Sequence, residues 1–294
     1  MMFKFSKKRS GKMGVSPAVS TVIMTGAMVA ILAVTLSFAN NFLWTSVAQG
    51  DFDSSKQLMQ TVGLQIDDVA WTVGRTETIT YGTQYGEITF ADSVLNYTVI
   101  VERDGLPTYN VSKETGALMF VFPTSKYSIT NGYWENIFPT QIESLTLKGT
   151  SAPVARVFAV EQLPMADGSY IRVVAAPSIR VLYSSINTTV SSTYYVRVYL
   201  PVLNPGESPR LSQSITLTGE SFTANTTGSV TGINISVDFP SGDAPQNFNS
   251  EFFNFPENSE TIEVPIIVGP GVEGYQDVVL ELYLSEVSVG FGIN

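Results

Sequence analysis

The sequence contains no cysteine and no histidine in its 294 residues. Without cysteine the chain cannot form disulfides, a thiolate nucleophile or a zinc-thiolate site, so packing alone must hold it together. Without histidine it lacks the commonest general base and metal ligand. We also find no nucleophile elbow, P-loop or dinucleotide-binding glycine motif. Two carboxylates are enough for a glycosidase, but no motif points to such a pair, so we expect a non-enzymatic protein that needs neither cofactor nor metal.

Charged residues are also absent between Gly14 and Gly50, and no acidic residue occurs before Asp51. Within this stretch, Ala18–Ala39 is uncharged and mostly apolar. As a helix it would rise about 33 Å at about 1.5 Å per residue, enough to cross a hydrocarbon layer of about 30 Å. We therefore expect it to span a membrane, with lipid as a partner. The basic residues that precede it are Lys4, Lys7, Lys8, Arg9 and Lys12.

The chain after Gly50 is acidic. Of the 16 Lys and Arg, the 11 outside the basic tip face 26 Asp and Glu, which leaves this part near −15. Because Lys and Arg beside a membrane helix stay cytoplasmic, the tip should lie inside the cell and the acidic head outside. A head of this charge repels phosphate backbones, so no nucleic-acid partner is expected.

The junction between the basic leader, residues 1–14, and the apolar stretch has a distinctive order of residues. Gly14 is followed by Val15, Ser16 and Pro17, and then by the apolar run. Over about residues 4–44 this resembles the class III signal peptide of archaeal type IV pilins. The resemblance implies that a prepilin peptidase cuts between Gly14 and Val15 and that the helix stays on the mature protein. Bacterial pilins carry Glu at the fifth mature position, where this chain has Val19, which fits the archaeal branch.

Two other interpretations of the apolar stretch remain open. Small-x-small triplets end at Ala39 and Ala48, where a signal peptidase could release a secreted protein, although the run is longer than a usual signal core. A membrane helix that is never cleaved is the other alternative.

A mostly small-residue stripe recurs along the apolar helix at steps of three and four. Such a stripe lets a second helix approach closely, so it predicts an assembly face for copies of this chain or for other pilins. Glycine and alanine are also frequent in membrane helices that do not assemble. The stripe consists of Ala18, Val22, Gly26, Ala30, Ala33 and Ser37.

Helical periodicity returns between residues 52 and 73, and Gly74 is a stop signal. In the pilin family the second half of the helix packs on the head. The resemblance therefore implies an N-terminal helix over 15–74, with 15–46 in the membrane or filament and 52–73 on the head. A break at Gly50 is left open. The predicted apolar face comprises Leu58, Val62, Ile66, Val69 and Val73.

From residue 75 onwards β-branched and aromatic segments alternate with turn signals, and no long helical period appears. We therefore predict an α+β fold: a long N-terminal hydrophobic helix followed by a β-rich head, 75–294, of antiparallel sheets in one or two β-sandwiches. If there are two, the best seam is 201–210, which has three prolines. The predicted strands are 95–101, 117–122, 154–160, 170–174, 179–183, 193–200, 214–217, 233–239, 261–268 and 278–289.

Five Asn-x-Ser/Thr sequons occur, and an outside head makes them candidate glycosylation sites. Asn187 and Asn225 lie in NTT stretches that look like turns, so we favour them. Asn96 and Asn234 fall on predicted strands, where they must face outward to be modified. The fifth sequon is at Asn110.

Several groups of acidic residues are candidate metal sites. The residues from Asp51 to Asp53 begin like a calcium loop, but Lys56 and Val62 replace the Gly and Glu that an EF-hand needs. Asp67 and Asp68 would point about 100° apart on a helix, which argues against a shared two-carboxylate site. A late stretch rich in Phe and Pro also contains acidic residues. We expect them to face solvent rather than to form a surface calcium site. They are Glu251, Glu257, Glu260 and Glu263.

Together these features favour a pilin-like cell-surface subunit, anchored by its helix, assembling into a filament and displaying its head for adhesion or surface contact. The first alternative is a single-pass membrane protein that never polymerises and uses its head as a binding module. The second is a secreted β protein or hydrolase.

Overall fold

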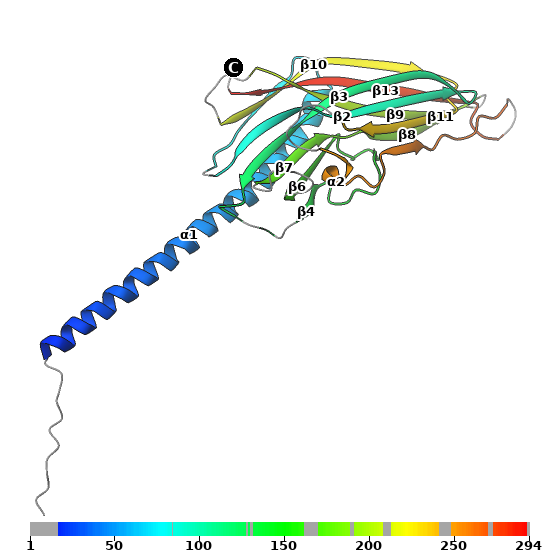
Figure 1. Ribbon diagram of the computed structural model, residues 1–294. Coiled ribbons are helices and arrows are strands. Elements are labelled where there is room, and N and C mark those ends of the chain that lie inside the picture. The colour runs from blue at the N-terminus through cyan, green and yellow to red at the C-terminus, as the bar shows by residue number, and fades with distance from the viewer. Residues whose placement is uncertain are drawn as a thin grey trace, which may run out of the picture. The chain divides into compact units, whose positions relative to one another are not determined.

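The computed structural model describes residues 17–83, 85–127, 129, 132–161, 170–188, 191–207, 213–240, 248–269 and 273–292. By their internal contacts, the residues divide into two compact units, Met1–Val47 and Ala48–Asn294. Helix α1 belongs to both units, and the second unit, the head, contains the strands (Figure 1).

Helix α1 spans Pro17–Ala70 and is continuous through Gly50, so the break that the sequence left open does not occur. Pro17 begins the helix, where its missing N–H has no intrahelical partner to lose. The helix ends at Ala70, before the predicted end at 73, and Gly74 follows with φ of +80°. The sequence therefore predicted the helix and placed its end one turn too late.

The elements that follow α1 are short loops, strands and one helical turn (Figure 1). They are β1 (Thr76–Thr80), β2 (Glu87–Arg103), β3 (Leu106–Pro123), β4 (Trp134–Phe138), β5 (Leu147–Lys148), β6 (Ala155–Glu161), β7 (Tyr170–Pro177), β8 (Arg180–Asn187), β9 (Ser192–Pro205), β10 (Ser214–Thr227), β11 (Gly232–Asp238), α2 (Ser250–Phe253), β12 (Ser259–Ile262) and β13 (Asp277–Phe291).

Among the described residues these strands form a six-stranded and a seven-stranded sheet. The first has the order β1-β10-β13-β9-β8-β5, and the second β12-β11-β2-β3-β7-β6-β4. The α+β class with two β-sheets is confirmed. Most neighbours are antiparallel as expected, but β9 pairs with β13 in parallel over most of their length, as does β5 with β8.

The first half of the possible seam at 201–210 is not a linker. Residues 201–205 lie in β9 and pair with β13, near the middle of the six-stranded sheet. Strand β9 tolerates Pro201 and Pro205 although proline lacks an N–H for the ladder. Since 48–294 forms one compact unit, the head is not divided there.

Two apolar clusters hold the head together. One lies between the sheets and includes Phe158 and Val198. The other joins one face of α1 to side chains of the strands that point away from the first cluster. Val62 of α1 and Phe120 of β3 both belong to it and are fully buried. Of the predicted helix face, Val62, Ile66 and Val69 are buried and Leu58 is partly buried. Val73 lies beyond the helix end and is 60% exposed. Burial of this face gives the second half of α1 its place in the head.

Candidate functional site

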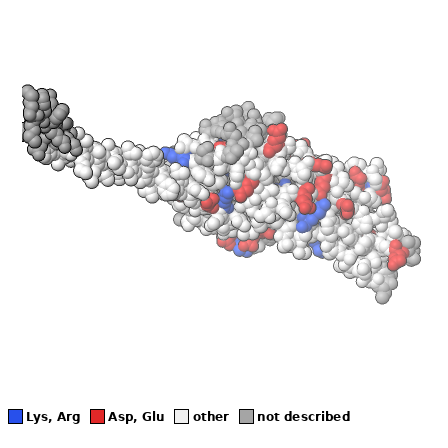
Figure 2. All heavy atoms as spheres, turned by 90° about the horizontal axis from the view of Figure 1, so that it is seen from below, with Lys and Arg blue, Asp and Glu red and all other residues white. Residues whose placement is uncertain are grey.

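The first half of α1 is a bare apolar helix. Every residue from Pro17 to Val47 is exposed, and large side chains such as Val22 and Phe38 are 71% and 72% exposed. In Figure 2 the described part of this segment carries no coloured sphere, whereas red spheres are scattered over the head. Apolar surface of this extent marks a contact with membrane or protein. The helix is long and apolar enough to cross a membrane, and it is compatible with a membrane anchor.

The threonine hydroxyls of this segment are satisfied within the helix. The hydroxyls of Thr21, Thr25 and Thr35 donate to the backbone carbonyl oxygens of Ala18, Thr21 and Ile31 at 2.9, 2.8 and 2.7 Å. Hydroxyls bonded in this way do not oppose insertion into lipid, where unsatisfied polar groups are costly.

The predicted assembly stripe is accessible along the whole segment. All six of its residues are exposed, and a Cβ added at Gly26 would meet no atom within 4 Å. The predicted cleavage site at Gly14 and Val15 lies outside the described residues, as does the basic leader.

The second half of α1 is fixed in the head by polar contacts as well as by apolar packing. Asp67 accepts a hydrogen bond from Trp71 Nε1 at 2.7 Å and forms an ion pair with Arg180 at 3.0 Å. Asp68 instead lies 3.7 Å from the Arg75 guanidinium. The two adjacent aspartates thus point to different partners and do not form a shared carboxylate site.

A second ion pair fixes the helix about three turns nearer its N-terminus. Lys56 bonds to the carboxylate of Glu135 on β4, and Tyr133 donates to the same carboxylate. Burial raises the pKa of Glu135, but the hydrogen bonds from Lys56 and Tyr133 outweigh burial and leave that pKa below its usual value. The helix is therefore tied to β4 at Lys56 and to β8 at Asp67.

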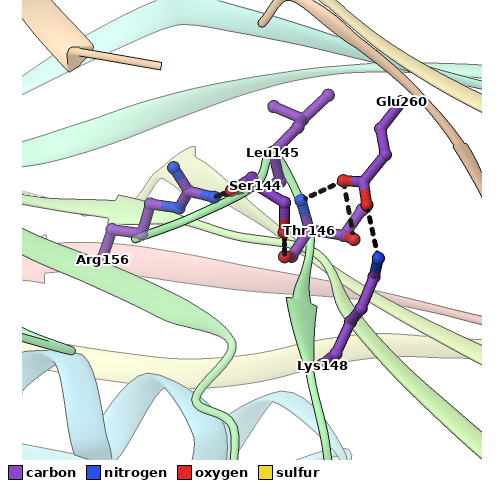
Figure 3. Close-up of polar contacts among 6 residues, drawn as sticks. All are labelled: Ser144, Leu145, Thr146, Lys148, Arg156 and Glu260. Carbon is purple, nitrogen blue, oxygen red and sulfur yellow. Dashed lines mark hydrogen bonds and ion pairs between the residues drawn. The ribbon is translucent and has the colours of Figure 1, made fainter. Parts of the chain in front are cut away.

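The connection between β4 and β6 is a pinned loop, which we call the 139–153 loop. It leaves β4 at one end of the seven-stranded sheet and adds β5 to the end of the other sheet. It then returns to β6. Three side chains hold the loop, and Figure 3 shows two of them, Glu260 and Arg156. The three side chains are Glu260 of β12, Arg156 of β6 and Arg180 of β8.

Glu260 holds the loop at Thr146 and Lys148 (Figure 3). Its carboxylate accepts hydrogen bonds from the backbone N and the hydroxyl of Thr146 at 2.8 and 2.9 Å, and lies 2.8 Å from Lys148 Nζ. Burial raises the pKa of Glu260, but the hydrogen bonds from Lys148 and Thr146 outweigh burial and hold that pKa below its usual value. The carboxylate is therefore ionised at neutral pH, and its hydrogen bonds and ion pair hold the loop in place.

Arg156 holds the same loop from inside the head. Its guanidinium donates to the carbonyl oxygens of Ser144, at 2.7 Å, and Leu145, and its Nε donates to the Ser178 hydroxyl at 3.1 Å. It also lies over the ring of Phe255, 4.8 Å from the centroid. Burial lowers the pKa of this guanidinium to about 10, so it stays charged at neutral pH.

A hollow of about 620 Å³ lies against this loop, and its lining residues all fall between Phe138 and Pro153. Small-molecule sites commonly have volumes of about 300–1,000 Å³. The wall combines an aromatic ring and prolines with amide, carboxylate and hydroxyl side chains. The loop is thus a candidate ligand site on a rigid support.

The sequons differ in accessibility. Asn110 and Asn187 are exposed, whereas Asn96 and Asn234 are half-buried on strands, where the burial of their neighbours places them on the outward faces. Asn225 does not lie in a turn, as the NTT pattern indicated, but within β10, opposite Leu282 of β13.

The amide of Asn225 has a partner in the other sheet. Its Nδ2 donates to the Tyr109 hydroxyl at 3.1 Å. A glycan would be attached through this nitrogen, so the structure disfavours Asn225 and favours Asn110 and Asn187.

The remaining acidic candidates do not converge. Residues 51–53 lie inside α1, where Asp51 accepts a hydrogen bond from the Tyr85 backbone N at 3.2 Å. In the part of the chain that the structure describes, no group of three acidic side chains could hold a metal ion.

The comparisons with known proteins return nothing: no family model, curated protein or solved structure matches this chain. The residues of the 139–153 loop were not identified from the sequence. The available signals were Arg156 and Arg180, which are charges inside the predicted strands 154–160 and 179–183. Their partners in the loop are backbone carbonyls, which the sequence does not mark.

Proposed function

We propose that this chain is a pilin-like surface subunit that its N-terminal helix anchors in a membrane and that polymerises through this helix into a type IV pilus-like filament. The observation that carries the proposal is the character of α1. One continuous helix has a bare apolar half and a half that packs into the head. The Gly14-Val15-Ser16-Pro17 junction supports processing by a prepilin peptidase that leaves this helix on the mature protein.

Assembly is supported by the small-residue stripe. Lipid would cover the bare helix before assembly, and helices of other copies would cover it afterwards. Because the stripe residues are exposed and Gly26 has open space around it, two such helices can approach closely. The filament core would then consist of residues 15–46 of many copies.

We assign the head to the outside of the cell, where it serves adhesion or surface contact rather than catalysis. The acidic head and the basic tip support this orientation. The chain would reside in the cell membrane with its head outside, or in a surface filament.

A second candidate is a membrane-anchored binding protein that never polymerises. The hollow at the 139–153 loop favours it, because a head with its own ligand site has a use without a filament. Both candidates use the N-terminal helix as a membrane anchor. In the second candidate the small-residue stripe does not serve as an assembly face.

The N-terminal sequence of the mature protein tests the proposal. A start at Val15 is expected from prepilin processing. A start at Met1 would leave only the uncleaved anchor, and a start at Asn40 or Gln49 would contradict both membrane functions.

Assembly is tested by microscopy of cell-surface material from two variants. Gly26→Leu adds bulk on the stripe and is expected to abolish or shorten filaments. Thr35→Leu adds an apolar side chain nine residues away, on the opposite face at about 100° per residue, and should leave filaments intact. Normal filaments from Gly26→Leu would refute the stripe as an assembly face.

A further inference from the structure

The polar side chains of the 139–153 loop fall into two groups. The Thr146 hydroxyl, the Lys148 ammonium and the Ser144 hydroxyl bond to Glu260 or to the loop backbone. In contrast, no described residue hydrogen-bonds to the side chain of Gln141, Glu143 or Ser151, although all three are exposed and line the hollow. The first group builds the loop, and the second faces an open space.

Because the loop is held at several points, the backbone positions of Gln141, Glu143 and Ser151 are fixed relative to one another. Arg156 and Arg180 hold the carbonyl oxygens of Ser144 and Ala152, and β5 pairs with β8 between them. Side chains carried by a loop with so many fixed points keep their spacing, which lowers the entropy lost when a ligand is bound.

The charges around the hollow limit what it can bind. Lys148, the only cation in the lining, is neutralised by Glu260 at 2.8 Å, and the head as a whole is acidic, so an anion gains no partner. Glu143 is a single carboxylate, and no described cluster of acidic residues suits a metal ion. An apolar ligand would leave the amide, carboxylate and hydroxyl groups of the rim without water or partner.

The remaining class is a neutral, polyhydroxylated ligand. A carboxylate accepts hydrogen bonds from hydroxyls, and an amide and a hydroxyl both donate and accept. On the apolar part of the wall, the ring of Phe138 and the ring of Pro139 offer surface for the C–H faces of a sugar. We propose that the hollow of the 139–153 loop binds a neutral saccharide, with Glu143, Gln141 and Ser151 as its hydrogen-bonding groups. As a role for the head on the cell surface this rests on the proposed function, but binding itself does not require a filament.

The test uses the full chain purified in a detergent without a sugar headgroup, such as lauryldimethylamine oxide. Saturation-transfer NMR and calorimetry measure binding of glucose, galactose, mannose and N-acetylglucosamine. N-acetylneuraminic acid serves as the anionic comparator and putrescine as a cation without hydroxyls. We expect binding of at least one neutral sugar and none of the two comparators.

Two pocket variants and one control assign the binding to the loop. Glu143→Gln and Gln141→Ala should each weaken the affinity about tenfold, the effect expected for one lost hydrogen bond of about 1.4 kcal/mol. Glu114→Gln, on the exposed side of β3, should bind like the unaltered protein. Thermal unfolding shows whether each variant keeps its fold.

Several results would overturn the inference. These are no binding of any neutral sugar, binding by both pocket variants as tight as that of the unaltered protein, or tighter binding of putrescine or N-acetylneuraminic acid than of the neutral sugars. None of them bears on cleavage at Gly14 or on filament formation. Conversely, a mature protein that starts at Met1 leaves the sugar measurement unaffected.

Discussion

Gly63 lies on the face of α1 that packs tightly against the head. A Cβ added there would lie 2.9 Å from Cγ2 of Val157 on β6 and 3.8 Å from Cβ of Ala155. Val157 is fully buried and its branched side chain has little rotational freedom, so it cannot move aside cheaply. We therefore predict that Gly63→Ala weakens the docking of α1 on the seven-stranded sheet.

The magnitude follows from two opposing effects. Replacing glycine by alanine inside a helix stabilises it by about 0.8–1 kcal/mol. Overpacking a tight core by one methyl group costs about 1–3 kcal/mol. At Gly50, also inside α1, an added Cβ meets nothing within 4 Å, so only the first effect operates. The two variants should therefore differ by about 1–3 kcal/mol, with Gly50→Ala the more stable.

Denaturant unfolding of the full chain in detergent measures this difference. In a Trp44→Phe background, the fluorescence of Trp71 and Trp134 reports the head alone, since both residues belong to it. If Gly63→Ala is as stable as Gly50→Ala, the close approach of helix and sheet is refuted.

A double-mutant cycle separates this contact from general damage. Val157→Ala should remove the clash, so the effects of Gly63→Ala and Val157→Ala should be non-additive by about 1 kcal/mol or more, within the range found for contacting residues. Additive effects would contradict a direct contact between the two side chains.

The remaining predictions concern the loop network and the sequons. Glu260→Gln should lower the free energy of unfolding by about 1.5–3 kcal/mol at pH 7, because hydrogen bonds to a charged group are lost. The pKa of Glu260 is lowered by folding, so its contribution exists above the ordinary carboxyl pKa of about 4.3 and fades as the pH falls below that value. The variant and the unaltered protein should therefore converge in acid, and a constant difference from pH 7 to pH 3 would refute the charge. In a glycosylating host, Asn110→Gln and Asn187→Gln should each remove one glycan on a gel, whereas Asn225→Gln should change no mobility; a shift with Asn225→Gln would contradict the bond to Tyr109.

Local patterns predicted the elements whose causes are local. The uncharged stretch and the apolar period of Val62, Ile66 and Val69 were sufficient for α1, because helix periodicity depends on near neighbours in the sequence. Strands such as 95–101 and 278–289 lie within β2 and β13 for the same reason. The predicted strand 261–268 was too long, since β12 ends at Ile262 and Pro265 follows soon after.

Features that depend on distant segments were not predictable in this way. The parallel pairing of β9 with β13 joins residues more than eighty positions apart, and neither strand carries a mark of its partner's direction. From the sequence, Glu260 is expected on a solvated face, because nothing near it in the chain marks a partner. In the structure it accepts a hydrogen bond from Thr146, 114 residues away. The NTT pattern predicts a turn at Asn225 because Asn and Thr are common there, but Asn225 and its neighbours pair with β13 over most of the length of β10.

Arg180 connects the second half of α1 to the 139–153 loop. Its Nη1 donates to Asp67 of α1 at 3.0 Å and to the carbonyl oxygen of Ala152 in the 139–153 loop at 3.2 Å, while its guanidinium lies over the ring of Tyr199, 4.6 Å from the centroid. One side chain, only 13% exposed, therefore bonds to both the second half of α1 and the wall of the hollow. Because Arg180 bonds to both, displacing the loop from its support would also break a contact of the second half of α1.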